Sequence, residues 1–170
     1  YSVGGSSKNQ APGAQFSKEN AQSTANLLEA YTDLVVEYLS AQADAGAHAV
    51  QVFEAMGMTL GAKMFEELAL PHLEALASKL KARHPDVPLL VFARGVEDPL
   101  SVNLRLQKAG YDVITLDGEA QRSKSRDALG DSQVLQGNFD PKLLLPDSSQ
   151  EAIHAEVVAM LEAFGPVKLL

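Results

Sequence analysis

The stretch DSQVLQGNFDP, residues 131–141, contains a short apolar run that ends abruptly in small and polar residues. Val134 and Leu135 read as part of a buried strand, and Gln136-Gly137-Asn138 follow at once, before an Asp-Pro pair. The same change, from an apolar run to polar or glycine residues, occurs at residues 49–54, 89–95 and 113–118. A single strand that ends in polar residues is common, but four such ends along the chain indicate a repeated structural unit.

The segments between these strands have helical spacing. Apolar residues three or four apart predict helices over residues 24–45, 62–83, 99–108, 121–129 and 149–164. Pro71 is expected to start a new helix within the second segment, because proline fits the first helical turn. Residues 1–20 are rich in Gly, Ser, Asn and Gln and predict a loop. The first helix has one apolar stripe, made of Leu27, Leu28, Tyr31, Leu34, Val35, Tyr38 and Leu39.

The alternation of helices with short, nearly continuous apolar strands predicts an α/β fold with a buried parallel sheet. A fifth strand is expected to begin at Val167. The carboxyl ends of parallel strands meet at one edge, where α/β proteins build their sites. Any single polar exit is more often a turn or a helix cap, so it is the repetition that favours a ligand site. The residues expected to converge there are Glu54, Arg94, Asp117 and Asn138, beside Gly57, Gly95, Gly118 and Gly137.

The composition is that of one globular domain of 170 residues, 46% of them apolar, with a net charge of −8. The acidic charge is spread along the chain, which argues against nucleic-acid and membrane-surface proteins but not against binding of an acidic small molecule. The absence of cysteine excludes disulfides and thiolate chemistry. No stretch approaches the roughly 20 apolar residues of a membrane span. We expect the chain to be part of a longer protein, because it begins at Tyr1 and stops within a predicted strand.

No catalytic motif stands out on its own. Residues 3–8, VGGSSK, are glycine-rich and include a lysine, but they lack the spacing of a phosphate-binding loop. No Ser-His-Asp arrangement is indicated, so the residues alone predict only part of an α/β enzyme with a site at its strand ends. The histidines are not spaced as metal ligands. They are His48, His72, His84 and His154.

Seven segments, in order along the chain, resemble the uroporphyrinogen decarboxylase family. YSVGGSSK is similar to the family segment Tyr-x-Val-Glu-Gly-Gly-Ser-Ser-Lys, and AGAHAVQVFEAMG to Ala-Gly-Ala-x-Ala-x-x-x-Phe-(Asp/Glu)-(Ser/Thr). The other matching segments are LALPHL, VPLLVFAR, AGYDVITLD, VLQGNFDP and FGPVKLL. The pairing of LQGN-x-DP with AGYDV-x-x-LD is the most specific part of a match that covers essentially the whole chain.

The resemblance implies a (β/α)8 TIM barrel. Residues 1–170 would be a single partial barrel domain of about four to five βα units, with strands four to seven and the start of strand eight. It also implies the removal of four acetate carboxyl groups from uroporphyrinogen III, without metal or cofactor, to give coproporphyrinogen III in haem and chlorophyll biosynthesis. The partners implied are the tetrapyrrole substrate and a second copy in a homodimer, with no nucleic acid and no membrane. The compartment would be the cytoplasm or a plastid.

The resemblance places few site residues in this chain, because the family's Asp, Arg cluster and late His lie outside it. Tyr1 matches the Tyr that contacts a substrate carboxylate, and Ala55 stands where the family has a Ser or Thr hydroxyl near the same arm. Arg94 stands at a family Lys, and the family's Glu before Gly4 is missing. The strand-exit pattern adds further rim residues that we expect to bind substrate, namely Gly5, Glu54, Asp117 and Asn138.

Two other functions remain open at this point. A corrinoid- or cobalamin-linked methyltransferase on the same barrel would bind zinc through His and Cys, and this chain has no Cys. A degenerate, non-catalytic member is suggested by Ala55 and by the missing Glu, since alanine cannot donate a hydrogen bond. By itself the chain is expected to be inactive and to self-associate, because an open barrel leaves its edge strands unpaired.

Overall fold

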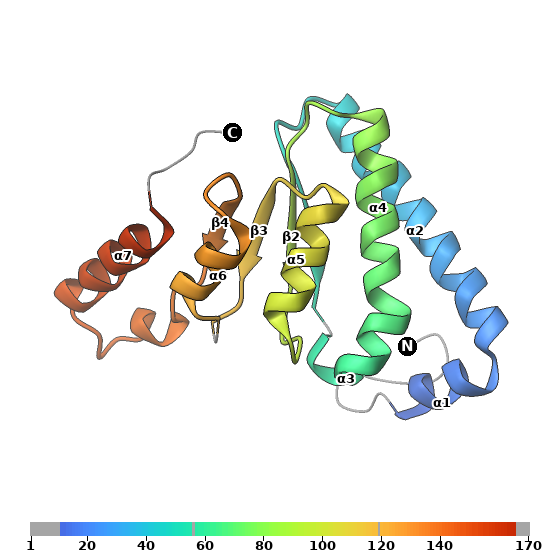
Figure 1. Cartoon of the computed structure of the whole chain (residues 1–170), viewed down its shortest axis with the longest axis horizontal. Helices are drawn as coiled ribbons and strands as arrows, with labels where there is room; N and C mark the ends of the chain where they lie inside the picture. The colour runs from blue at the N-terminus through green and yellow to red at the C-terminus, as the bar shows by residue number, and fades with distance from the viewer. Residues whose placement is uncertain (1–10, 56, 119, 166–170) are drawn as a thin grey trace.

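The computed structural model describes residues 11–55, 57–118 and 120–165, which form one parallel sheet and a layer of helices (Figure 1). The strands are β1 (Val50–Glu54), β2 (Leu89–Ala93), β3 (Val113–Leu116) and β4 (Val134–Gly137). The helical elements are α1 (Ala11–Glu19), α2 (Ala21–Asp44), α3 (Gly57–Met64), the π-helix η1 (Phe65–Ala69), α4 (Leu70–Arg83), α5 (Pro99–Ala109), α6 (Arg122–Leu129), the 3-10 helix η2 (Pro141–Leu144) and α7 (Gln150–Phe164).

The strands lie side by side in sequence order, β1-β2-β3-β4, and each neighbouring pair is parallel. Consecutive helices pack on one another, α2 on α4, α4 on α5, α5 on α6 and α6 on α7. Figure 1 shows this row, from α2 and α4 at one end of the molecule to α7 at the other. Sequential parallel strands, each joined to the next through a helix, form a sector of a βα barrel. The predicted α/β fold is confirmed, while the predicted fifth strand at Val167 lies outside the described residues.

The core lies between the sheet and the helices. Alternate strand residues face it, and the register places Val50 beside Leu89 and Val91 beside Ile114. These side chains are all buried, and Leu106 of α5 belongs to the same fully buried cluster. Burying an aliphatic side chain of this size contributes about 1.5–3 kcal/mol. This layer therefore fixes the register on which the positions of the strand ends depend.

Capping residues fix where the helices next to the strands begin and end. Asp98 accepts a hydrogen bond from the backbone N–H of Ser101 at 3.1 Å and starts α5. Gly110 ends that helix in the left-handed conformation, with φ of +103°. Ser149 accepts from the N–H of Ala152 at 3.1 Å and starts α7. Such a cap contributes about 1 kcal/mol and sets the direction in which the chain enters the helix.

The loop predicted for residues 1–20 is wrong over its second half, where α1 forms. The Gly and Ser content that suggested a loop lies mostly before Ala11, outside the described residues. Within α1, Ser17 Oγ donates to the carbonyl oxygen of Gly13 at 2.9 Å, and Gln15 donates to Glu19 one turn later at 2.9 Å. These short-range bonds support a helix that the overall composition of the segment concealed.

The apolar stripe of α2 is largely exposed. Leu34 is 61% exposed and Tyr38 68% exposed, and Leu27 and Tyr31 are also exposed. The buried face shares Leu39 with the stripe and otherwise consists of residues that the apolar pattern leaves out. Contacts with α4 explain this orientation, because Thr32 Oγ1 lies 2.9 Å from His72 Nδ1 and the two helices exchange ion pairs. The buried residues of α2 are Thr24, Thr32, Val36, Leu39 and Ser40.

The helical segment after β1 begins at Gly57, earlier than the predicted residue 62. Gly61 interrupts it with non-helical angles, φ +71° and ψ 159°, which explains why the apolar period becomes regular only afterwards. A π-helical turn follows, and Pro71 then lies in the first turn of α4, as predicted. No helix within the described ranges is both long and apolar enough to span a membrane.

Candidate functional site at the carboxyl edge of the sheet

The four strands end side by side at one edge of the sheet. Glu54 pairs in register with Ala93, and Leu116 with Gly137. Beyond the strands, the backbone N–H of Arg94 donates to the carbonyl oxygen of Glu54 at 2.9 Å. The predicted convergence of the strand exits is therefore confirmed for the backbone. We call this edge the mouth, which consists of residues 54–55, 94–95, 117–118 and 137–138.

Asp117 ties two neighbouring strand exits together. Its Oδ2 accepts a hydrogen bond from the backbone N–H of Gly95, after β2, at 2.6 Å. Its Oδ1 accepts from the N–H of Gly118 at 2.8 Å. A carboxylate that accepts backbone N–H groups beside a glycine stabilises a turn, which is the commoner role of an Asp-Gly pair. The structure thus gives Asp117 a structural role at the place where we predicted a substrate contact.

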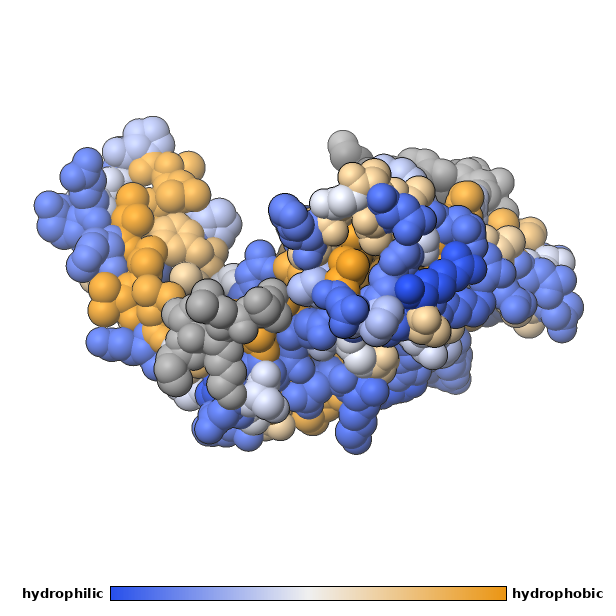
Figure 2. All heavy atoms as spheres, turned by 90° about the horizontal axis from the view of Figure 1, so that it is seen from above, coloured by the Kyte–Doolittle hydropathy of each residue, from blue (hydrophilic) through white to orange (hydrophobic). Residues whose placement is uncertain are grey.

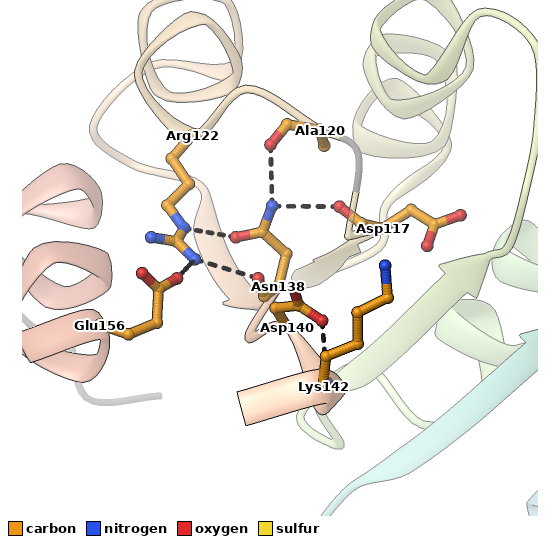
Figure 3. Close-up of polar contacts among 7 residues, drawn as sticks. All are labelled: Asp117, Ala120, Arg122, Asn138, Asp140, Lys142 and Glu156. Carbon is orange, nitrogen blue, oxygen red and sulfur yellow. Dashed lines mark hydrogen bonds and ion pairs between the residues drawn. The ribbon is translucent and has the colours of Figure 1, made fainter. Parts of the chain in front are cut away.

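Asn138 joins the exits of β3 and β4, as Figure 3 shows. Its Nδ2 donates to the carbonyl oxygens of Ala120, at 2.8 Å, and of Asp117, at 3.1 Å. Its Oδ1 accepts from Nε of Arg122, and only 8% of the residue is exposed. Both amide protons of Asn138 are therefore already donated within the protein.

Arg122 and Glu156 complete this cluster and were not predicted from the sequence. Arg122 begins α6, and its guanidinium also donates to the carbonyl oxygen of Asn138 at 3.0 Å and to the Glu156 carboxylate of α7. The two charged side chains are only 18% and 28% exposed. Each charge of this partly buried pair is matched by the opposite charge and by hydrogen bonds.

Glu54 ends β1 with its side chain on the helix-facing side of the sheet. Strand side chains alternate, so Glu54 shares its side with Val50 and Val52. A Cβ placed on Gly57 would come 3.1 Å from Glu54 Oε2, and Glu54 lines a cavity of about 340 Å³ between α1, α2 and α3. Glu54 therefore joins the other exits through its backbone, while its carboxylate points into the helix layer.

The opposite, open face of the sheet carries a second set of side chains. Phe53 is 67% exposed there, although it is a large aromatic residue inside a strand. Beside it, Gln51 Nε2 donates to Thr115 Oγ1 at 3.4 Å, and Thr115 Oγ1 donates to Gln136 Oε1 at 3.3 Å. We call Phe53, Gln51, Thr115 and Gln136 the open-face set. An exposed ring beside neutral hydrogen-bonding groups can hold a flat organic molecule.

The mouth also contains a glycine that no other residue could replace without strain. Gly137 has φ of +79° and precedes a cis peptide bond to Asn138. A Cβ on Gly137 would lie 3.1 Å from the carbonyl oxygen of Leu116 on the neighbouring strand. Both the positive φ and the neighbouring strand therefore favour glycine at this strand exit.

The remaining predicted site residues fall into two groups. Ala55 follows β1 directly and is exposed at the mouth. Tyr1 and Gly5 lie outside the described residues, so their substrate contacts stay predictions. Among the described residues, no group of three or more His, Asp or Glu side chains is arranged to hold a metal ion.

Two side chains with raised pKa values lie away from the mouth. The hydrogen bonds that Arg105 donates to the Glu74 carboxylate, at 2.7 and 2.8 Å, raise the pKa of Arg105 and join α4 to α5. Burial raises the pKa of Tyr111, whose hydroxyl donates to the carbonyl oxygen of Leu73 at 2.9 Å. Tyr111 precedes β3, so it lies near the amino edge of the sheet. Both groups support the scaffold rather than the site.

Different signals would have been needed to find the residues that sequence reasoning missed. The exposed position of Phe53 follows from strand alternation, because Val52 and Glu54 on either side must face the helices. Nothing local connects Arg122 with Glu156, which are 34 residues apart. Their pairing depends on how α6 and α7 pack and could not be inferred from one sequence.

Comparisons with known proteins match this chain to one family. The family model described as "Uroporphyrinogen decarboxylase (URO-D)" matches residues 1–168. The uroporphyrinogen decarboxylase of Salinibacter ruber is 39% identical over 96% of this chain and 45% of its own length. Those of Homo sapiens and of Zea mays, the latter named as chloroplastic, are 36% and 34% identical over 96% of this chain, and over 44% and 40% of their own lengths. The chain thus spans slightly less than half the length of these relatives.

Proposed function

The chain belongs to the uroporphyrinogen decarboxylase family, and from this membership we propose that the protein carrying it converts uroporphyrinogen III to coproporphyrinogen III. The reaction would remove four acetate carboxyl groups as CO₂, in haem or chlorophyll biosynthesis. The observation that carries the proposal is the match over residues 1–168, nearly the whole chain. Six of the seven sequence segments that resemble the family lie in order within that range, and the seventh, FGPVKLL, begins within it.

The chemistry needs an electron sink at the pyrrole ring. In each step, the bond between the methylene and carboxyl carbons of one acetate arm breaks, and CO₂ leaves. The electron pair passes into the pyrrole ring, which has first taken up a proton. A proton then adds to the methylene carbon, leaving a methyl group, and the ring proton is released. Protonating the ring first stabilises the charge that develops, so no metal or organic cofactor is required for the step.

In this proposal, residues 11–165 contribute part of the cleft wall. The open-face set offers the exposed ring of Phe53 to a flat tetrapyrrole and neutral amide and hydroxyl groups to its polar atoms. Asp117 and Asn138 would shape the rim mainly by holding the loops at the mouth. Glu54 would contribute to the rim through its backbone, because its carboxylate lies on the helix-facing side of the sheet. This division follows from which side chains are exposed and which are already hydrogen-bonded.

Two further contacts are proposed from the family resemblance. Tyr1 would bind a substrate carboxylate, and Ala55 would lie near the same arm without the family's hydroxyl. Gly5 is proposed separately, as a rim residue that does not come from the resemblance. We also propose that residues 1–170 form a single partial barrel domain and that the protein works as a homodimer. The bacterial and chloroplastic relatives support a location in the cytoplasm or a plastid.

The direct test is a decarboxylation assay on the protein that carries this chain. The protein is incubated anaerobically with uroporphyrinogen III, and the products are oxidised to porphyrins and separated by their number of carboxyl groups. We expect seven-, six-, five- and four-carboxyl products to appear in turn. A folded protein that forms none of them would overturn the proposed activity.

Ala55→Ser adds a sharper test, because it restores the family's hydroxyl at an exposed position. If Ala55 lies beside an acetate arm, the serine should lower KM by about threefold to tenfold, as one added hydrogen bond would. Gly118→Ala is a matched control, since it also adds one group at an open place in the mouth but no donor. If wild type and Ala55→Ser both bind the substrate without converting it, the protein is instead a non-catalytic member of the family. The methyltransferase alternative is not favoured, because the relatives compared are named as decarboxylases.

A further inference from the structure

We propose that Arg122 is a positioning residue for the cleft, which acts through Asn138 on the exits of β3 and β4. The inference rests on the proposed function, since it concerns how that cleft is held. Figure 3 shows the arrangement, with Arg122 between Asn138 on one side and Glu156 on the other. Arg122 touches no member of the open-face set among the contacts of its guanidinium, so its effect on a ligand must be indirect.

Arg122 determines which way the Asn138 amide points. A guanidinium group can only donate, so the atom facing its Nε must be the amide oxygen. The amide nitrogen then faces the carbonyl oxygens of Asp117 and Ala120 and donates to both. With the amide reversed, its nitrogen would meet Arg122 and its oxygen would meet two carbonyl oxygens, and all these contacts would be lost.

Through hydrogen bonds, the position of the Asn138 amide affects the neighbouring strand exits of the mouth. Asn138 holds the backbone of Asp117, and the Asp117 carboxylate holds the backbone N–H of Gly95 at the exit of β2. The N–H of the next residue back, Arg94, donates to Glu54 at the end of β1. A continuous series of hydrogen bonds therefore begins at Arg122 of α6 and crosses the strand exits as far as β1.

Glu156 fixes the position of Arg122 in turn. None of the residues of α7 is buried, so the helix is held loosely by apolar contacts. The ion pair of Glu156 with Arg122 is a specific contact between α7 and α6, and Arg122 in turn contacts Asn138 of the mouth. Partial burial of both charges strengthens their attraction relative to a surface pair. The position of α7 is thereby coupled to the geometry of the strand exits.

Arg126 provides a matched control on the same helix. It lies one turn after Arg122 and donates to the backbone carbonyl oxygens of Gly130, Gln133 and Phe164 at 2.8, 2.8 and 3.0 Å. Gly130 and Gln133 precede β4, at the far end of the sheet from the mouth. Replacing either arginine with glutamine therefore removes a charge and several hydrogen bonds, but only Arg122 is connected to the strand exits.

The test compares R122Q, R122K and R126Q in the protein that carries this chain. We expect R122Q to lower kcat/KM, per folded molecule, by about tenfold or more and to accumulate five- to seven-carboxyl intermediates. R122K should behave similarly, because one ammonium group cannot hold both Asn138 and Glu156. R126Q should stay within about twofold of wild type with an unchanged product pattern, even where its melting temperature falls.

A second readout needs no substrate and separates this inference from the proposed function. The amide of Gly95 should exchange with solvent at least severalfold faster in R122Q than in R126Q, relative to the change in global stability. If wild type does not decarboxylate uroporphyrinogen, the proposed function fails and this comparison alone decides the role of Arg122. Equal exchange at Gly95 in both variants, or equal changes of product pattern, would overturn the positioning role.

Discussion

Replacing Asn138 with alanine tests whether this residue supports the mouth or binds substrate. The change removes two bonds donated by Nδ2 and one accepted from Arg122, in a side chain that is 8% exposed. A neutral hydrogen bond contributes about 1 kcal/mol and one to a charged group about 1.5–3 kcal/mol. Because water has little access to replace them, we expect the free energy of unfolding to fall by about 3–5 kcal/mol.

Asn138→Asp separates the donors from the acceptor. It keeps an oxygen for Arg122 but places another oxygen against the carbonyl oxygens of Asp117 and Ala120. The loss should be smaller than for alanine, at about 2 kcal/mol, because the contact with Arg122 is retained as an ion pair. Gln22→Ala serves as the control, since this amide is exposed on α2 and bonds only to Asn26, at 2.8 Å. Its effect should lie within about 0.5 kcal/mol.

The measurement is urea unfolding followed by circular dichroism, with the midpoint and the slope fitted separately. A shift of the midpoint at constant slope reports a change in stability alone. If Asn138→Ala unfolds with the same free energy as wild type, within about 0.5 kcal/mol, the supporting role is refuted. A large rise in KM without loss of stability would then return Asn138 to its predicted place as a substrate contact.

Three further predictions concern packing, ionisation and exposure. Gly57→Ala should cost about 1–3 kcal/mol, because its Cβ would lie 2.7 Å from the carbonyl oxygen of Arg94. Above pH 10, Tyr111 loses its proton in the unfolded chain but keeps it in the folded protein, where the hydroxyl is buried. The free energy of unfolding should therefore fall as the pH rises, by about 1.4 kcal/mol per pH unit from this residue. Tyr111→Phe should remove that part of the pH dependence. Leu34→Lys and Tyr38→Lys should leave the unfolding free energy of the isolated chain within about 0.5 kcal/mol but reduce its self-association, measured by sedimentation.

Each of these has its own contrary result. A Gly57→Ala protein as stable as wild type would mean that the exit of β2 can shift to make room. Parallel pH profiles for wild type and Tyr111→Phe between pH 9 and about 12 would show that Tyr111 is not protected from ionisation in the folded state. Unchanged association of the two lysine variants would show that the exposed stripe of α2 is not the adhesive surface of the isolated chain.

Local signals were enough to predict the strands and the mouth. The strand at residues 113–116 was predicted to the residue, because β-branched residues there lie between a glycine and an Asp-Gly pair. The helices over residues 99–109 and 150–164 were predicted to within about one residue at each end, since their capping residues are visible in the sequence. The order of the strands was expected only from the resemblance to a barrel, in which consecutive strands are neighbours.

What could not be predicted depends on partners distant in the sequence. The apolar stripe of α2 is a correct helical pattern, but its buried face was set by α4, through Thr32 with His72 and two ion pairs. Figure 2 shows a similar exposure at α7, where apolar side chains gather along the helix beside a hollow in this face of the molecule. The curated relatives are more than twice as long as this chain, so such faces are where the rest of a barrel would pack.

The polar residues of the sheet differ in how many hydrogen-bonding groups their side chains have available for a ligand. Asn138 donates both of its amide protons to backbone carbonyls, and Asp117 receives a backbone N–H on each oxygen. A ligand could take these groups only by breaking bonds that hold the mouth in shape. Phe53 and Gln136 are exposed on the open face, and Gln136 accepts a hydrogen bond only from Thr115 within that face, at 3.3 Å, so both can meet a ligand without loosening the mouth. Under the proposed function, a substrate would therefore meet residues within the strands, and the residues that end the strands would keep those contacts in position.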